Sequence, residues 1–497
     1  MDAIVSGLMS IMNWQVMLLI LGGVALGIVF GAIPGLTANM AVALCIPITF
    51  GMDMIPSTSL LVGLYIGGIS GGLISAILLK IPGTPSSIAT TFDGAPMAAR
   101  GEAGKALSTG ILASFLGGMF SFVVLIFVSP YLAEFAMGFS PFDYFSVVLF
   151  SLTLMASLSG PNLKKGLIAG FLGIVVSFVG ADPIDGLPRF TFGIQALDGG
   201  FAQLPVLIGL FAVAEIIETA EKAYVLKHQE KVSYKVEKIR IPWAEYKDQV
   251  WNFFRSCLIG TGIGILPGIG GGVSNLISYT TAKKQSRHPE KFGTGCVDGI
   301  IASETANNAC IGGAMIPLLT MGIPGDAVTA MLVGGFMIQG VSPGPLMFVQ
   351  QKELIYAIFG ALIVANVCML LMMFLAMNGF IRVLNTPKEV LLPFVMAICI
   401  IGAYGSNNRV FDIFVVLIFG VVGFVLKKFG FPTPPMIMGL ILGPIFETNL
   451  RRGLMFSHNS IVPFFTQPIS LIFICLAVVS VVLTVRKKKK QEESEDV

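Results

Sequence analysis

Charged residues are scarce in this chain: Asp, Glu, Lys and Arg make up 12% of its 497 residues, while 55% are hydrophobic. A soluble domain carries about 25% charged residues. Runs of about 18 or more apolar residues recur along the sequence, and each can cross a hydrocarbon core about 30 Å thick. Alternating segments of about ten residues, typical of outer-membrane barrels, are absent. We therefore expect an all-α polytopic membrane protein with about 10–14 membrane segments.

Motifs for enzymatic chemistry are also missing. The seven cysteines are scattered singly, and the three histidines lie in polar stretches, so neither a metal-binding nor a disulfide framework is indicated. The sequence has no Walker A motif, and its glycine clusters lie in apolar rather than strand-like surroundings, which argues against ATP and dinucleotide sites. The net charge of +3 is small. We expect no enzyme, no organic cofactor and no nucleic-acid partner.

The positive charge is concentrated in two places. Residues 219–255 contain eight Lys or Arg, and Lys487 to Lys490 lie near the C-terminus. The positive-inside rule places both segments in the cytoplasm, and the acidic loop 181–200 outside. These observations predict a first transmembrane half 1–218, a cytoplasmic basic linker 219–255, a second transmembrane half 256–485 and a charged cytoplasmic tail 486–497, whose end we expect to be disordered.

Each predicted half contains two Pro-Gly breaks in an otherwise apolar region. They are Pro34-Gly35 and Pro82-Gly83 in the first half, and Pro267-Gly268 and Pro324-Gly325 in the second. The two breaks are 48 residues apart in the first half and 57 in the second. Broken apolar segments at matching places point to a transporter binding site. We predict two structurally repeated halves with broken or re-entrant helices; the topology alone does not decide whether the repeat is inverted.

The breaks supply candidate groups for an anion. Backbone groups freed in lipid need partners, and the N-terminus of a half-helix carries partial positive charge that suits a carboxylate. The alternative for residues 80–94 is an ordinary surface turn. The expected substrate-binding residues are Pro34, Gly35, Thr37, Asn39, Pro82, Gly83, Thr84, Ser86, Ser87, Pro324 and Gly325.

A second group of polar residues suits a cation. Glu304, Asn307 and Asn308 share one face of a predicted helix, and a charge at the bilayer centre costs about 2.5–3.5 kcal/mol even on the milder scales. Their oxygens suit a hard cation. The expected Na⁺ ligands are Gly268, Ser274, Asn275, Glu304, Asn307, Asn308 and Asp326. The alternatives are a satisfied interhelical hydrogen-bond network and, for Asp326, a helix N-cap.

Seven pieces of the sequence, taken in order, resemble the large membrane subunit of the tripartite tricarboxylate transporters, the TctA family. They are GAIPGLTANMAVAL, IPGTPSSIATTFDGAPMAARGEAGKAL, VGADPIDGLPRFTFG, FGTGCVDGIIASETANNACIGGAMIPLLTMGIPGD, GVSPGP, GAYGSNNRVFDI and PPMIMGLILGPIFETNLRR. The resemblance extends from Gly31 to about Pro468. A single Ile-Pro-Gly would be unspecific, whereas seven pieces in order are highly specific.

The resemblance implies a multi-pass subunit of a secondary active importer in the bacterial cytoplasmic membrane, moving an organic anion such as a di- or tricarboxylate. It implies two partners, an extracytoplasmic solute-binding protein and a small membrane subunit, and a second copy of the chain is a candidate third. Na⁺ symport is expected; proton coupling and a passive anion channel are the alternatives. Lys80 departs from the family, which tends to have a small polar residue there. It either snorkels to the membrane interface or adds a cation near an anion site.

Overall fold

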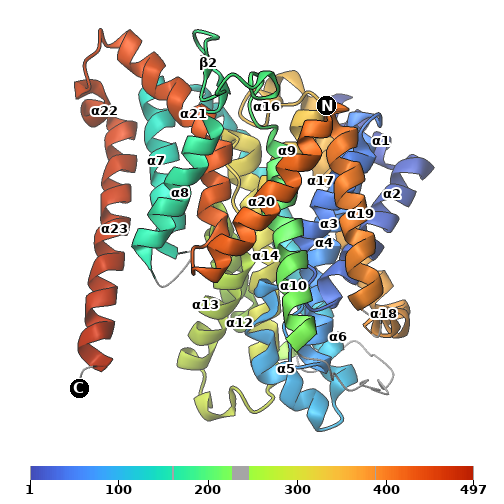
Figure 1. Cartoon of the computed structure of the whole chain (residues 1–497). Coiled ribbons are helices and arrows are strands. Elements are labelled where there is room, and N and C mark those ends of the chain that lie inside the picture. Colours follow the sequence, from blue (N-terminus) through green and yellow to red (C-terminus); the bar gives the residue numbers. More distant parts are fainter. Residues whose placement is uncertain (1, 159–161, 226–245, 385, 387, 496–497) are drawn as a thin grey trace. The chain divides into compact units, whose positions relative to one another are not determined.

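The computed structural model of the chain describes residues 2–158, 162–225, 246–384, 386 and 388–495. Helices dominate these residues, and the two short strands pair antiparallel with Gly180 opposite Arg189 (Figure 1). The elements in chain order are α1 (Asp2–Ile11), α2 (Trp14–Ala32), α3 (Ala38–Cys45), η1 (Ile46–Thr49), α4 (Met54–Leu78), η2 (Pro85–Ser87), α5 (Thr90–Ala99), α6 (Ala103–Met137), α7 (Pro141–Leu158), α8 (Leu163–Ser177), β1 (Gly180–Ala181), β2 (Pro188–Arg189), η3 (Gln195–Leu197), α9 (Gln203–Leu207), η4 (Ile208–Val213), α10 (Ala214–Val225), α12 (Val250–Ile265), α13 (Gly270–Gln285), η5 (Pro289–Lys291), α14 (Val297–Met321), α15 (Ala327–Ile338), α16 (Met347–Gln350), α17 (Lys352–Leu375), α18 (Met377–Val383), α19 (Lys388–Asn407), α20 (Val410–Lys428), α21 (Thr433–Phe456), α22 (Val462–Thr466) and α23 (Pro468–Glu495).

The chain forms two compact units. Unit 1 consists of Met1–Ala133 and Glu215–Ser406, and unit 2 consists of Glu134–Ala214 and Asn407–Val497. Each unit therefore joins a stretch from the first predicted half to a stretch from the second. A division by contacts differs from a division by repeats, so the halves 1–218 and 256–485 stay a prediction. In the linker predicted at 219–255, residues 226–245 lie outside the described residues.

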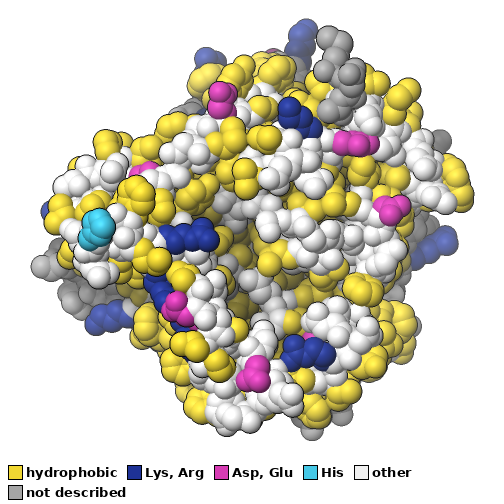
Figure 2. All heavy atoms as spheres, turned by 90° about the horizontal axis from the view of Figure 1, so that it is seen from above, with side chains coloured by type: hydrophobic (Ala, Val, Ile, Leu, Met, Phe, Trp, Pro, Cys, Tyr) yellow, Lys and Arg dark blue, Asp and Glu magenta, His cyan; other side chains and the backbone are white. Residues whose placement is uncertain are grey.

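Membrane-spanning helices confirm the all-α polytopic class. Eight helices in the described residues are long and apolar enough to cross a membrane, and three shorter apolar helices accompany them. The apolar window of α4 is 100% buried, whereas that of α23 is 11% buried. Helix α4 is thus a core element of unit 1, while α23 leaves apolar side chains for lipid to cover. On the face seen in Figure 2, charged side chains are few and scattered among hydrophobic and uncharged ones.

Two helix pairs of unit 1 pack in the same register. Gly31 of α2 lies against the carbonyl of Gly68 in α4, and Gly264 of α12 lies against the carbonyl of Cys310 in α14. Numbers in α12 exceed those in α2 by 233, and numbers in α14 exceed those in α4 by 242. The same two offsets relate Gly27–Leu64 to Gly260–Ala306 and Gly71–Ile28 to Gly313–Thr261. These matching contacts support the internal repeat that the sequence predicts.

Proline and glycine stop the helices at the breaks. The Pro34 ring cannot continue the hydrogen-bond ladder of α2, and Gly35 then turns the chain at a φ of 94°. The side chain of Thr37 accepts a hydrogen bond from the Met40 N–H at 3.3 Å, which caps the N-terminus of α3. At the equivalent place in the second half, Gly268 has a φ of 77°. The chain is therefore interrupted at both places, but only the helix after the first, α3, has a side-chain cap, since α13 begins without one.

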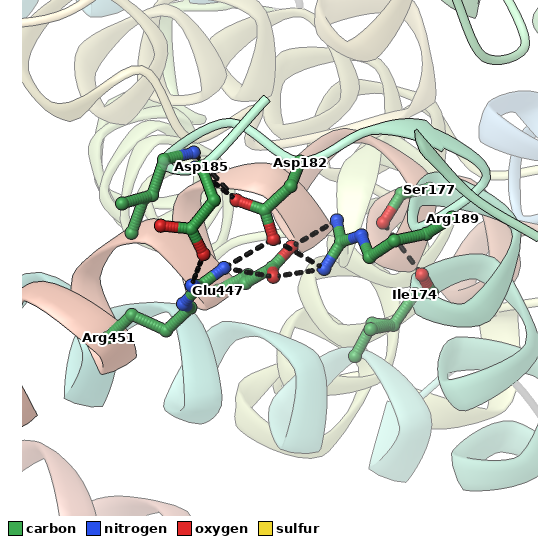
Figure 3. Close-up of polar contacts among 8 residues, drawn as sticks. Ile174, Ser177, Asp182, Asp185, Arg189, Glu447 and Arg451 are labelled. Atoms are coloured by element: carbon green, nitrogen blue, oxygen red, sulfur yellow. Dashed lines mark hydrogen bonds and ion pairs between the residues drawn. The ribbon is translucent and has the colours of Figure 1, made fainter. Parts of the chain in front are cut away.

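In unit 2, an ion-pair cluster ties the β1–β2 hairpin to α21 (Figure 3). Arg189 donates to both carboxylate oxygens of Glu447, at 2.5 and 3.0 Å, and lies 3.1 Å from Asp182. Arg451 donates to Asp182 and Asp185. The bidentate geometry and shared partners make this cluster stronger than an isolated surface pair. It fixes the loop 181–200, which charge counting places outside the membrane.

The Asp182 carboxylate is the centre of this cluster. The backbone N–H groups of Asp185 and Ile184 donate to it, and together with Arg451 and Arg189 they lower the pKa of Asp182 to about 2. The carboxylate therefore stays charged at any physiological pH. Because all its oxygens are used within the hairpin and α21, we assign the cluster a structural role.

One expectation near the C-terminus was wrong. The tail expected to be disordered is helical to Glu495, because α23 continues through its lysines. Lys, Gln and Glu are good helix formers, so a polar sequence after a membrane helix can extend it into water.

Candidate functional site

The later break of the first half and the earlier break of the second meet in unit 1. There η2 packs against the start of α13. A Cβ atom on Gly272 would lie 3.2 Å from the Pro85 carbonyl oxygen, and one on Gly271 would lie 3.0 Å from the Ser86 hydroxyl. Glycines at the start of α13 thus allow the two chain segments to approach closely. We call this place the junction.

Asn307 from α14 lies between the junction and Glu304. Its side chain is 1% exposed, and neither its Oδ1 nor its Nδ2 atom makes a hydrogen bond of ordinary geometry within the described residues, although the amide lies close to the Glu304 carboxyl. The Oδ1 atom lies 2.6 Å from the place that a Cβ of Gly271 would occupy. A buried amide left unsatisfied costs about 1–3 kcal/mol. Such an amide needs a partner that the chain does not supply in good geometry, such as a water molecule or a ligand.

The junction offers several donors to an anion. The first N–H groups of α13, a helix of 16 residues, have no partner inside their own helix. The helix dipole adds partial positive charge at this end. Ser86 is 8% exposed, while Thr84 and Ser87 bond each other at 3.1 Å. A carboxylate at the junction would therefore meet backbone N–H groups, a hydroxyl and the Asn307 amide.

The two breaks of the first half meet on neighbouring turns of α4. Gly68 lies against Ala38 at the start of α3, and Gly72 lies against Thr84 and Ser87. Pro34, Gly35, Thr37 and Asn39 are all partly exposed. The structure thus brings the predicted anion residues of the first half to one side of α4, while Pro82 and Gly83 form the bend between them.

Glu304 is fully buried beside the junction. Its Oε1 accepts a hydrogen bond from the Thr90 hydroxyl at 2.5 Å, and its Oε2 accepts one from the Ser114 hydroxyl at 3.1 Å. No Lys or Arg forms an ion pair with it within the described residues. A buried carboxylate without a cation is costly. A bound cation or a proton would remove this cost.

Three other predicted cation ligands already have partners. Asn275 accepts from the Ala89 N–H at 2.7 Å and donates to the Ser303 carbonyl at 3.2 Å. Ser274 donates to the Ala306 carbonyl at 2.8 Å. Asn308 accepts from the Ser70 hydroxyl at 2.7 Å and donates to the Glu304 carbonyl at 3.1 Å. For these residues, the interhelical network considered above describes what is seen.

Asp326 is a helix N-cap, as the alternative interpretation has it. Its side chain accepts from the Thr329 N–H at 2.7 Å, and the two residues form a capping box at the start of α15. Its other oxygen accepts from the Tyr65 hydroxyl at 2.5 Å. Asp326 follows the Pro324-Gly325 bend. There the Gly325 carbonyl accepts a hydrogen bond from the Gly268 N–H at 2.7 Å. A direct backbone hydrogen bond therefore joins the two second-half breaks.

Three contributing residues were missed from the sequence: Tyr65, Thr90 and Ser114. Thr90 belongs to a visible run of hydroxyls, but Ser114 lies alone in a long apolar run. Tyr65 had an unused signal: it is 242 positions before Asn307, the offset that relates α4 to α14. Lining up the two halves residue by residue would have singled it out.

Known proteins resemble this chain over most of its length. The family model described as "Tripartite tricarboxylate transporter TctA family" matches residues 17–438. A relative from Agrobacterium vitis, "Uncharacterized 52.8 kDa protein in TAR-I ttuC' 3'region", is 33% identical over 476 residues, which is 95% of this chain and 94% of the relative. A second protein of that organism, "Uncharacterized protein in TAR-II ttuC' 3'region", is 34% identical over 241 residues, 48% of this chain and 100% of that protein. No solved structure matches.

Proposed function

Because the chain belongs to the tripartite tricarboxylate transporter TctA family, we propose that it is the subunit that moves an organic anion of the di- or tricarboxylate class across the cytoplasmic membrane. The observation that carries this proposal is the buried, unpartnered amide of Asn307 at the junction. The Ser86 hydroxyl and the N–H groups at the start of α13 can donate to a carboxylate. Asn307, which the sequence grouped with the cation ligands, would join them if its amide turned so that Nδ2 and not Oδ1 faced Gly271. A carboxylate is the ligand class that uses all three.

We propose Na⁺ as the coupling ion, with Glu304 as the charged group of its site. Glu304 is fully buried, its two oxygens accept hydrogen bonds from the Thr90 and Ser114 hydroxyls, and the Asn307 amide lies close to it. Na⁺ would neutralise the carboxylate and take further oxygens from hydroxyls and carbonyls nearby. Binding the cation close to the junction would also lower the electrostatic cost of bringing in an anion, which couples the two ligands. A proton on Glu304 is the alternative.

The family implies two partner subunits, one in the membrane and one that binds solute outside it. We propose that the solute-binding protein delivers the anion to the extracytoplasmic side and that a small membrane subunit completes the transporter. Because the binding protein meets the solute first, much of the choice among carboxylates would lie there. The chain itself would act as the carrier and not as an enzyme.

Reconstitution of the chain with both partners in liposomes tests this function. We expect labelled citrate to accumulate above its outside concentration only with an inward Na⁺ gradient and the cognate binding protein present. Accumulation driven equally by a proton gradient without Na⁺ would favour the proton alternative. Unitary currents with equilibration instead of accumulation would favour a passive channel and overturn the proposal. Dissipating the Na⁺ gradient with an ionophore is the control.

A further inference from the structure

Lys80 holds a backbone conformation that suits glycine better than lysine. Its φ is 57°, and it is the only non-glycine residue with a positive φ among the described residues of unit 1. In this left-handed region, the Cβ atom of an L-residue crowds the following carbonyl oxygen, so long side chains are uncommon there. The strained residue comes directly after Leu79, which caps the C-terminus of α4.

The internal repeat shows what the unstrained choice would be. Residue 322, 242 positions after Lys80, is a glycine. Gly322 caps α14 with a φ of 73°, the same conformation at the same distance from an Ile-Pro-Gly break. Glycine populates this region without a steric penalty. The first half therefore keeps a lysine where the second half has the residue that the backbone favours.

The side chain of Lys80 has no partner that would hold it away from a ligand. It is exposed and makes no hydrogen bond or ion pair within the described residues. In the sequence, Lys80 comes four residues before Thr84 and six residues before Ser86, which lies at the junction. The donors at the junction itself are neutral: a hydroxyl, an amide and backbone N–H groups. They suit one carboxylate, whereas each further carboxylate of a polyvalent anion needs a cation nearby.

We propose that Lys80 is a specificity-determining residue of the anion site, whose ammonium favours tricarboxylates over dicarboxylates. This inference rests on the proposed function. The strain of the left-handed backbone is retained because a glycine at this position would remove the charge. A lysine that only anchors α4 at the membrane interface would contribute nothing to the choice among anions.

Four variants of the full transporter test the inference, with citrate and succinate as probes. Lys80→Gly removes both strain and charge, so we expect the thermal midpoint to rise by about 1–2 °C. We also expect the citrate-to-succinate uptake ratio to fall about tenfold. Lys80→Met removes the charge and keeps the strain, so it should lower the ratio without the gain in midpoint. Lys80→Arg should keep the ratio near that of the wild type.

The fourth variant is a control for strain. His458 in unit 2 is also left-handed, at a φ of 53°, and is exposed. His458→Gly should raise the midpoint and leave the uptake ratio unchanged. An unchanged ratio in both Lys80→Gly and Lys80→Met would overturn the inference alone, as would a lowered ratio in His458→Gly. A wild-type transporter that takes up neither anion would overturn the proposed function, and this inference with it.

Discussion

The two Ile-Pro-Gly breaks of unit 1 share a backbone plan but differ in chemistry. After the first break, the hydroxyls of Thr84 and Ser87 bond each other at 3.1 Å. After the second, the residues at the same offset are Asp326 and Thr329, with the Thr329 hydroxyl 2.8 Å from the Asp326 carboxylate. The first break thus has two neutral hydroxyls at the positions where the second break has an aspartate and a threonine. An anion is repelled less at the first break than at the second.

The residues that reach each break from the opposite half differ in the same way. Tyr65 of α4 donates to Asp326 and so closes the second break. Its counterpart in α14 is Asn307, which lies beside Ser86 with both polar atoms unpartnered. At the second break the protein itself supplies the hydrogen-bond partner, whereas at the first break a ligand would have to supply it. The comparison teaches that two breaks with matching backbone contacts can differ through one polar residue each.

We expect the largest effect from alanine substitutions that destabilise both breaks equally. A Cβ on Gly83 would overlap the carbonyl oxygen of Gly31, and one on Gly325 would lie 2.6 Å from the carbonyl oxygen of Gly264. Because backbone cannot move aside cheaply, Gly83→Ala and Gly325→Ala should each destabilise the fold by about 3 kcal/mol. We expect little monodisperse protein in size-exclusion chromatography from either variant.

Matched controls for this prediction lie in the same two helix pairs. Gly22 in α2 and Gly262 in α12 have no atom within 4 Å of a built Cβ. Alanine there should stabilise the helices by up to about 1 kcal/mol. If only one of Gly83→Ala and Gly325→Ala impaired folding, the two breaks would not be structurally equivalent, and the repeat proposed for them would fail.

The next effect should separate the two breaks. Asn307→Leu keeps the shape but removes the unsatisfied amide, so we expect the free protein to gain about 1 kcal/mol in stability while uptake falls at least about tenfold. Tyr65→Phe removes a donor from the buried Asp326 carboxylate, which should cost about 1–3 kcal/mol. It should leave the uptake rate within a factor of about three.

Thermal unfolding in detergent measures the stability of each variant, and uptake in liposomes measures its transport. Stability and transport should move in opposite directions in Asn307→Leu. A variant Asn307→Leu that is destabilised and still transports would mean that the amide has a structural partner and no ligand. A loss of transport in a stable Tyr65→Phe would place the working site at the second break.

Much of this arrangement follows from the sequence, and the part that does not has a physical reason. Proline and glycine act locally, so the four breaks could be predicted from their positions. Glu304 and Asn307 stood out because polar groups are costly in lipid. Which hydroxyl meets which carboxylate depends on helix packing across more than 200 residues, as for Thr90 and Glu304. Residues adjacent along a helix face, such as Asn307 and Asn308, therefore looked alike although only one lacks partners.

The smallest expected effect comes from making the first break resemble the second. Thr84→Asp introduces the acid found at the equivalent position 326, with Ser87 in place to bond it as Thr329 does Asp326. The fold should tolerate this exchange at a cost of up to about 1–3 kcal/mol, because the second break holds its acid with a Tyr65 hydroxyl that the first break replaces by the Asn307 amide. The added negative charge should raise the half-saturating citrate concentration about tenfold by Coulomb repulsion.

Thr84→Asn is the matched control, since it has the same size as aspartate and no charge. It should change the half-saturating concentration by less than about twofold. Equal effects of Thr84→Asp and Thr84→Asn would mean that shape, and not charge, distinguishes the breaks. An unchanged citrate dependence in both variants would mean that the first break is not part of the anion site. A carboxylate bound at Ser86 and Asn307 would be repelled by a new negative charge two residues away.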